Sequence, residues 1–238
     1  MKSVLRSAAL AAALLAHPAL ARASGATLPT GPVTLPPDLC DPDEPAERGR
    51  RFFVTPVAVR TTEDFVSIRP ELRLTGAVLG IQYRTSDDLT VQAAAGVLGG
   101  TIDPGGGELT LEPGLTVQGA ATWRVIAGYD EDPFVMATAG AAYLRTASEG
   151  GEAYRSVEFS LSLAFGKGYG GFAPYVAAKA LAGPSTWDHG KEELKGNVGA
   201  HFQLAGGIAV LLGRGFDLQA EVSPWAAQAV VISLGWTR

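Results

Sequence analysis

The sequence predicts an all-β fold, an antiparallel up-and-down transmembrane β-barrel with ten strands. Three observations support this prediction: apolar residues alternate with small or polar ones, these stretches hold almost no charge, and an export signal precedes them. Of the 238 residues, 47% are apolar and 18% are charged, which excludes a disordered chain. The single cysteine excludes a disulfide framework and a multi-cysteine zinc site.

Residues 1–23 are predicted to be a secretory signal peptide. Lys2 and Arg6 precede ten small or apolar residues at 7–16, and Ala21-Arg22-Ala23 forms an A-x-A cleavage site. A run of ten residues is too short for a membrane-spanning helix, which needs about 20. Cleavage after Ala23 removes three cations and no anions, so the formal net charge changes from −5 to −8. We expect no nucleic-acid partner, because the net negative charge of the mature chain opposes binding to the phosphate backbone.

Residues 24–50 are predicted to be a Pro-rich periplasmic lead-in to the barrel. Proline fixes φ and removes a hydrogen-bond donor, and six prolines fall in this stretch, so an extended or disordered segment is expected. Cys40 lies within it without a preceding small-residue lipobox, so lipid attachment is not expected. A free thiol and an intermolecular disulfide remain open as roles for Cys40.

Residues 51–238 are predicted to form the barrel, because they alternate with period two. In the clearest stretch, Phe159 and Leu161 interleave with Ser160 and Ser162. The ten expected strands are Phe52–Arg60, Arg73–Arg84, Leu89–Val97, Leu115–Gly128, Phe134–Arg145, Arg155–Gly166, Gly171–Ala182, Val198–Leu212, Phe216–Ser223 and Ala227–Trp236. The first strand is interrupted by Pro56, and eight strands is the alternative count.

The number of charged residues in the strands distinguishes a transmembrane barrel from a soluble exported one. Five strand stretches at 115–128, 134–144, 156–166, 171–182 and 198–212 hold 63 residues, of which only Arg124, Glu158 and Lys179 are charged. A sheet face in water would carry many more charges, and an Arg or Lys facing lipid near the midplane would cost about 2–4 kcal/mol. A soluble exported β-barrel that binds an apolar ligand remains the alternative.

The connectors alternate in length, as short periplasmic turns and long outer loops do in membrane barrels. The long ones are expected at Leu98–Gly114, Thr146–Tyr154 and Gly183–Asn197. If the turn at 167–170 is centred between Gly168 and Tyr169, Glu158 faces Lys179 and forms a lumen ion pair. The turn at 213–215 should place Val210 opposite Leu218 and Leu212 opposite Phe216. The expected lumen charge network comprises Arg60, Arg84, Arg124, Glu158, Lys179, Asp217 and Glu221.

The last strand places Gln228, Val230, Ile232, Leu234 and Trp236 on one face. Together with the signal peptide and the alternating strands, this makes the chain resemble small bacterial outer-membrane β-barrel proteins of the OmpA and OmpX kind. The resemblance implies a Gram-negative outer-membrane location, lipid as a partner, and recognition of the last strand by the assembly machinery. Related chains usually end on the aromatic residue, whereas Thr237 and Arg238 follow it here. The oligomeric state stays open.

No catalytic, cofactor or metal site is predicted. His189 lies beside Asp188 in an expected loop, and His201 has no serine at two-residue spacing. The stretch 103–108 lacks the oxygen spacing of a calcium loop. A narrow barrel is filled largely by its own side chains, so we predict a non-enzymatic outer-membrane protein with a structural, surface-interaction or narrow-lumen role. An outer-membrane barrel enzyme, such as a lipid A modifying hydrolase, is the alternative.

Overall fold

The computed structural model describes residues 49–127, 132–190, 192–198, 202–225 and 227–238. The predicted signal peptide, nearly all of the lead-in, Cys40 and His201 lie outside these residues. The described strands are β1 (Arg50–Phe65), β2 (Glu71–Arg84), β3 (Leu89–Asp103), β4 (Leu109–Ala127), β5 (Pro133–Ala147), β6 (Ala153–Lys167), β7 (Phe172–Ala182), β8 (Pro184–His189), β9 (Glu192–Val198), β10 (Phe202–Gly213), β11 (Phe216–Ser223) and β12 (Gln228–Thr237). In the described residues, no helix is long and apolar enough to cross a membrane.

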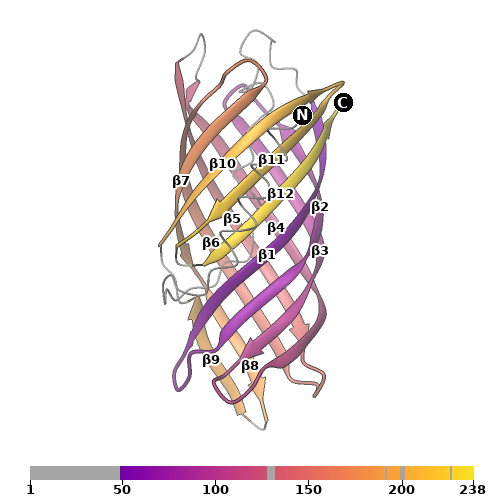
Figure 1. Cartoon of the computed structure of the whole chain (residues 1–238), viewed down its shortest axis with the longest axis vertical. Helices are drawn as coiled ribbons and strands as arrows, with labels where there is room; N and C mark the ends of the chain where they lie inside the picture. The colour runs from indigo at the N-terminus through magenta and orange to yellow at the C-terminus, as the bar shows by residue number, and fades with distance from the viewer. Residues whose placement is uncertain (1–48, 128–131, 191, 199–201, 226) are drawn as a thin grey trace, which may run out of the picture.

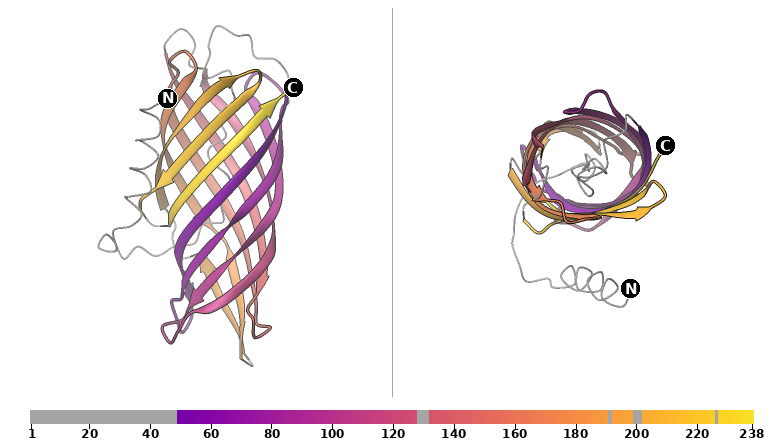
Figure 2. Two further views of the ribbon diagram at one scale, coloured as in Figure 1. Left: turned by 45° about the vertical axis from the view of Figure 1, so that its right-hand side comes forward. Right: turned by 90° about the horizontal axis from the view of Figure 1, so that it is seen from above.

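The strands form one antiparallel sheet that closes on itself, because β1 pairs with β2 on one side and β12 on the other. Figure 2 shows the resulting ring from above. β7 and β8 follow one path along β6 on either side of Gly183, and β9 and β10 continue one another in the same way. The described sheet therefore has ten strand paths, which confirms the predicted closed barrel of ten strands.

The two ends of the barrel differ in strand number, because β1 changes its partner along its length. Residues 51–60 of β1 pair with β12, whereas Glu63–Phe65 pair with β9. The β11–β12 hairpin turns back at 224–227, so eight strands (β1–β6, β8 and β9) close the wall beyond it. We call the eight-stranded end the outer end. The ten-stranded end, which holds Arg50 and Arg238, is called the inner end (Figure 1).

A continuous apolar belt surrounds the ten-stranded part. It consists of the outward-facing residues of 52–58, 77–83, 91–97, 115–125, 135–143, 157–165, 172–182, 202–212, 216–222 and 230–236, none of which is charged. Leu79 and Leu161 are among its most exposed side chains, at 68% and 65%. The segments are 7–11 residues long, close to the 9–11 residues of a tilted transmembrane strand. A belt of this height matches the hydrocarbon core of a membrane, so its residues face lipid.

Beyond the belt the alternation inverts while the strands continue. On β2, Leu79 and Ile81 face outward within the belt, but further out Arg73 faces outward and Leu72 and Leu74 are buried inside. The outside has changed from lipid to water at this point, so the polar face turns outward and the apolar face inward. The predicted long loops at Leu98–Gly114 and Gly183–Asn197 are consequently wrong, since most of their residues extend the strands. The connector predicted at Thr146–Tyr154 is shorter than expected, because β5 runs to Ala147 and β6 begins at Ala153.

The register of two hairpins tests the predicted turns. β10 and β11 pair Val210 with Leu218 as predicted, but a bulge between Leu211 and Gly213 places Gly213, not Leu212, opposite Phe216. The predicted β6–β7 register is wrong, because Lys179 lies opposite Ser162. Gly170 and Gly171, both at positive φ, move the reversal toward β7. The shift is by an even number of residues, so each side chain stays on the same face of the sheet. Glu158 and Lys179 therefore both still face inward.

Candidate functional site

At the inner end, a buried ion pair joins the first strand of the barrel to its second-last strand. Arg51 Nε donates to Asp217 Oδ2 at 2.8 Å and Arg51 Nη2 to Asp217 Oδ1 at 2.6 Å, with both side chains only 3% exposed. The guanidinium also lies over the Phe53 ring, 5.3 Å from its centroid. The pair crosses β12 at Gly235, where a Cβ would overlap both partners. The forked geometry therefore locks the seam at which the sheet closes.

A second charged cluster lies deeper in the lumen. Lys179 Nζ donates to Glu221 Oε1, and Tyr175 OH donates to Glu221 Oε2 at 3.0 Å. Gly207 of β10 lies between these residues, and a Cβ there would overlap the Tyr175 ring. All three polar side chains are buried. Glycine on the intervening strand thus lets side chains two strands apart meet inside the barrel.

The structure places six of the seven expected lumen charges in the interior, with Arg60 as the exception. The buried ones are Arg84, Arg124, Glu158, Lys179, Asp217 and Glu221. Arg60 is wrongly assigned, because it faces outward just past the belt, with its side chain 51% exposed. Sequence reasoning missed Arg51, although it shares the inward parity of Phe53, because the expected strand began one residue later.

The outer part of the lumen is filled by apolar side chains, which we call the plug. Its buried members are Val57, Val59, Phe65, Leu72, Leu74, Leu98, Ile102, Leu111, Ala142, Leu144, Tyr154, Trp187, Ala229 and Val231. Every strand of the eight-stranded end contributes, since Leu194 of β9 also packs against the cluster. Leu98, Leu144 and Trp187 have no exposed surface at all. Within the described residues, the plug therefore fills the outer part of the lumen with apolar side chains.

Glu63 is a buried carboxylate that forms hydrogen bonds within the plug. It lies where β1 pairs with β9. Ser185 Oγ donates to its Oε2 at 2.7 Å, and Tyr154 OH donates to its Oε1 at 3.0 Å. Glu63 lies beyond the belt, which ends at Ala58 on β1. Burial without a cation raises the pKa of Glu63 to about 7, although the two hydroxyl hydrogen bonds lower it. Its charge therefore depends on pH near neutrality.

The histidine singled out in the sequence takes part in a contact between two outer turns. His189 Nδ1 lies 3.3 Å from Glu152 Oε2, and Gly190 N donates to Glu152 Oε1 at 2.8 Å. The His189 ring packs on Trp187 at 4.5 Å, whereas Asp188 lies 3.7 Å from Arg155 on the outer face. The adjacent Asp188 and His189 thus engage different groups. Among the described residues, no three His, Cys, Asp or Glu side chains gather as metal ligands.

Comparison with known proteins finds similar solved structures, all with low sequence identity to this chain. No protein-family model matches the chain, and no curated protein matches it. The translocator domain of autotransporter NalP from Neisseria meningitidis is similar over 84% of this chain and 91% of its own, with 11% identity and a TM-score of 0.45. The outer membrane protease OmpT from Escherichia coli is similar over 88% and 100%, with 9% identity and a TM-score of 0.46. An outer membrane channel from Pseudomonas putida F1 is similar over 82% and 99%, with 11% identity and a TM-score of 0.42.

The fold assignment rests on the closed sheet and the belt. A closed sheet leaves no unpaired edge in lipid, and an uncharged outer face is stable only there. The chain is therefore an outer-membrane β-barrel protein, and the soluble exported barrel is excluded by the apolar outer face.

Proposed function

We propose that this protein is a non-enzymatic outer-membrane barrel with a non-conducting lumen and a structural or surface-interaction role in the envelope. The observation that carries the proposal is the plug, which fills the eight-stranded outer end with apolar side chains. Hydrated ions cannot cross a close-packed apolar core. The buried pairs Arg51–Asp217 and Lys179–Glu221 further occupy the lumen on the inner side.

Conductance across a planar lipid bilayer tests the proposal. The wild-type barrel should give no stepwise current, whereas a variant with Phe65→Ala and Trp187→Ala should give steps, because both large plug side chains are removed. Heat-modifiable migration on gels confirms that each preparation is folded. Stepwise current through the folded wild-type barrel would overturn the non-conducting function.

A non-enzymatic role is supported by how little of the potentially catalytic side chains a substrate could reach. Ser185 and Glu63 are hydrogen-bonded to each other but are 1% and 0% exposed, so no substrate reaches them. His189 is accessible, but its described partners are the Glu152 carboxylate and the Trp187 ring, and neither supplies the hydroxyl or thiol that a histidine base activates in acyl transfer. Hydrolysis of lipid A or of a peptide by the purified barrel, lost in Ser185→Ala or His189→Ala, would contradict this part.

The partners that fit this proposal are outer-membrane lipid and the barrel assembly machinery. The last strand presents Val230, Ile232, Leu234 and Trp236 outward, and the Trp236 ring stacks with Phe52 and Phe216 at 6.3 and 6.4 Å. Replacing Trp236 by Ala should lower the fraction of heat-modifiable barrel recovered from membranes. An unchanged fraction would argue against recognition through this strand.

A further inference from the structure

A row of four outward-facing polar residues, three of them cations, crosses four neighbouring strands directly beyond the belt. Arg145 of β5 lies opposite Arg155 of β6, Arg155 opposite Thr186 of β8, and Thr186 opposite Lys195 of β9. We call these four residues the cation row. Neighbouring strands are about 4.8 Å apart, so the row spans roughly 15 Å across the outer surface.

The cation row sits where lipid headgroups meet the barrel. Two residues from the row, on the membrane side, Tyr143 and Val157 are the last belt residues of β5 and β6. Long basic side chains at this level can keep their stems on the apolar surface while their charged ends reach the headgroups. The row is therefore continuous with the lipid-facing surface.

The cations of this row are only loosely engaged by the protein. Arg155 lies 3.7 Å from Asp188, and Lys195 lies 3.7 Å from Glu193; both acids are on the side away from the membrane. Arg145 is exposed and has no side-chain hydrogen bond or ion pair with the described residues. The side of the row that faces the membrane thus keeps guanidinium and ammonium donors available.

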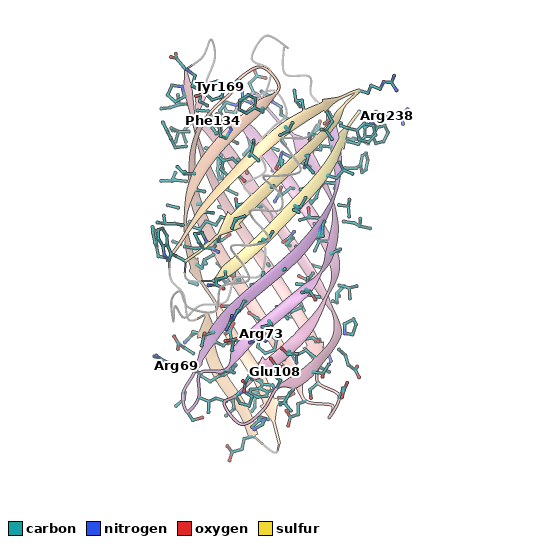
Figure 3. All side chains as sticks on the ribbon, viewed as in Figure 1. Arg69, Arg73, Glu108, Phe134, Tyr169 and Arg238 are labelled. Atoms are coloured by element: carbon teal, nitrogen blue, oxygen red, sulfur yellow. The ribbon has the colours of Figure 1, made fainter. Side chains whose placement is uncertain are left out.

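A second arginine pair provides the contrast within the same molecule. Arg60 and Arg73 also lie opposite each other, just beyond the belt on β1 and β2. Their guanidinium groups, however, donate to Glu71 at 2.9 and 2.6 Å, and Arg73 also donates to Glu108 at 2.9 Å. Figure 3 shows Arg73 and Glu108 together near the outer end. Burial raises the pKa of Glu71, but the hydrogen bonds and charges of the two arginines outweigh this and hold the pKa below its ordinary value.

We propose that Arg145, Arg155, Thr186 and Lys195 form a binding site for the phosphate of an anionic lipid headgroup in the adjacent leaflet. The planar guanidinium fork matches phosphate oxygens, and two forks side by side with a hydroxyl and an ammonium surround one such group with donors. Arg60 and Arg73 are a poor site, because carboxylates already take their donors.

Native mass spectrometry of the full chain in neutral detergent tests the site, with phosphatidic acid and phosphatidylcholine as probes. The wild-type barrel should retain phosphatidic acid more strongly than phosphatidylcholine. The R145Q/R155Q variant should lose about fivefold in affinity for each cation removed, or roughly 25-fold. The matched R60Q/R73Q variant should change by less than about twofold. Both variants alter only exposed side chains, and heat-modifiable migration verifies their fold.

Three results would overturn the proposal. Equal losses in the two variants would mean that the outer end attracts anions without a defined site. Equal retention of the two lipids by the wild-type barrel would remove the phosphate specificity. Displacement of phosphatidic acid by an equal concentration of inorganic phosphate would identify a site for small anions instead of a lipid site.

Discussion

The Arg51–Asp217 pair allows a quantitative prediction about how the barrel closes. Both side chains are 3% exposed, and their two hydrogen bonds measure 2.6 and 2.8 Å. Replacing Asp217 by Leu leaves a buried guanidinium without its carboxylate, which should cost about 3–5 kcal/mol in the free energy of unfolding. Replacing Arg51 by Met should cost a similar amount. The double variant should lose much less free energy of unfolding than the sum of the two single variants, because neither charge remains unpaired in it.

Urea unfolding of the barrel in lipid vesicles, followed by tryptophan fluorescence and heat-modifiable migration, measures these free energies. We expect a coupling energy of about 3 kcal/mol for the buried pair. The exposed pair Arg60–Glu71, with side chains 51% and 31% exposed, is the control and should couple by less than about 1 kcal/mol. Additive losses at Arg51 and Asp217 would refute the reasoning that the pair locks the seam.

Three further predictions concern the seam, the belt and the plug. Gly235→Ala should destabilise the barrel by about 1–3 kcal/mol in urea unfolding, because its Cβ overlaps Arg51 and Asp217; a neutral effect would contradict the close approach. Leu161→Arg should cost about 2–4 kcal/mol in vesicles, and Leu161→Met close to nothing; equal effects would contradict a lipid-facing Leu161. Glu63 is protonated in the folded barrel up to a pKa of about 7 but ionises near 4.5 when unfolded, so stability should fall as pH rises between these values. The free energy of unfolding should fall by on the order of 3 kcal/mol over this pH range. The same pH dependence in the Glu63→Gln variant would refute the assignment to Glu63.

The strand count and the inside–outside parity could be predicted from the sequence, because lipid imposes a strict alternation. Ser156–Phe165 shows this directly: Phe159, Leu161 and Leu163 face lipid, and Glu158 is buried in the lumen. A one-residue slip would place Glu158 in lipid, so parity is strongly determined. The same reasoning correctly placed Asp217 and Glu221 inside.

The outer end and the detailed register could not be predicted by this reasoning. Residues such as Leu72, Ile102 and Trp187 look like loop positions when an uncharged apolar face is the criterion, because their neighbours are charged or polar. They become interpretable once the alternation is allowed to invert where the strand leaves the membrane. Register across β6 and β7 depends on Gly170 and Gly171 in the turn, and the apolar pattern is identical after a shift by an even number of residues.

In its belt, the barrel turns apolar residues toward lipid and polar residues toward the lumen, which is the reverse of the arrangement in a water-soluble protein. Nitroxide labels at single cysteines along residues 157–165 of β6 test this directly, after Cys40→Ser removes the one native cysteine. In vesicles, oxygen collision rates should be high at positions 157, 159, 161, 163 and 165 and low at the residues between them, with a water-soluble nickel complex excluded from the former. High nickel accessibility at Phe159, Leu161 and Leu163, or the opposite alternation of oxygen collision rates, would show that this face of β6 does not meet lipid.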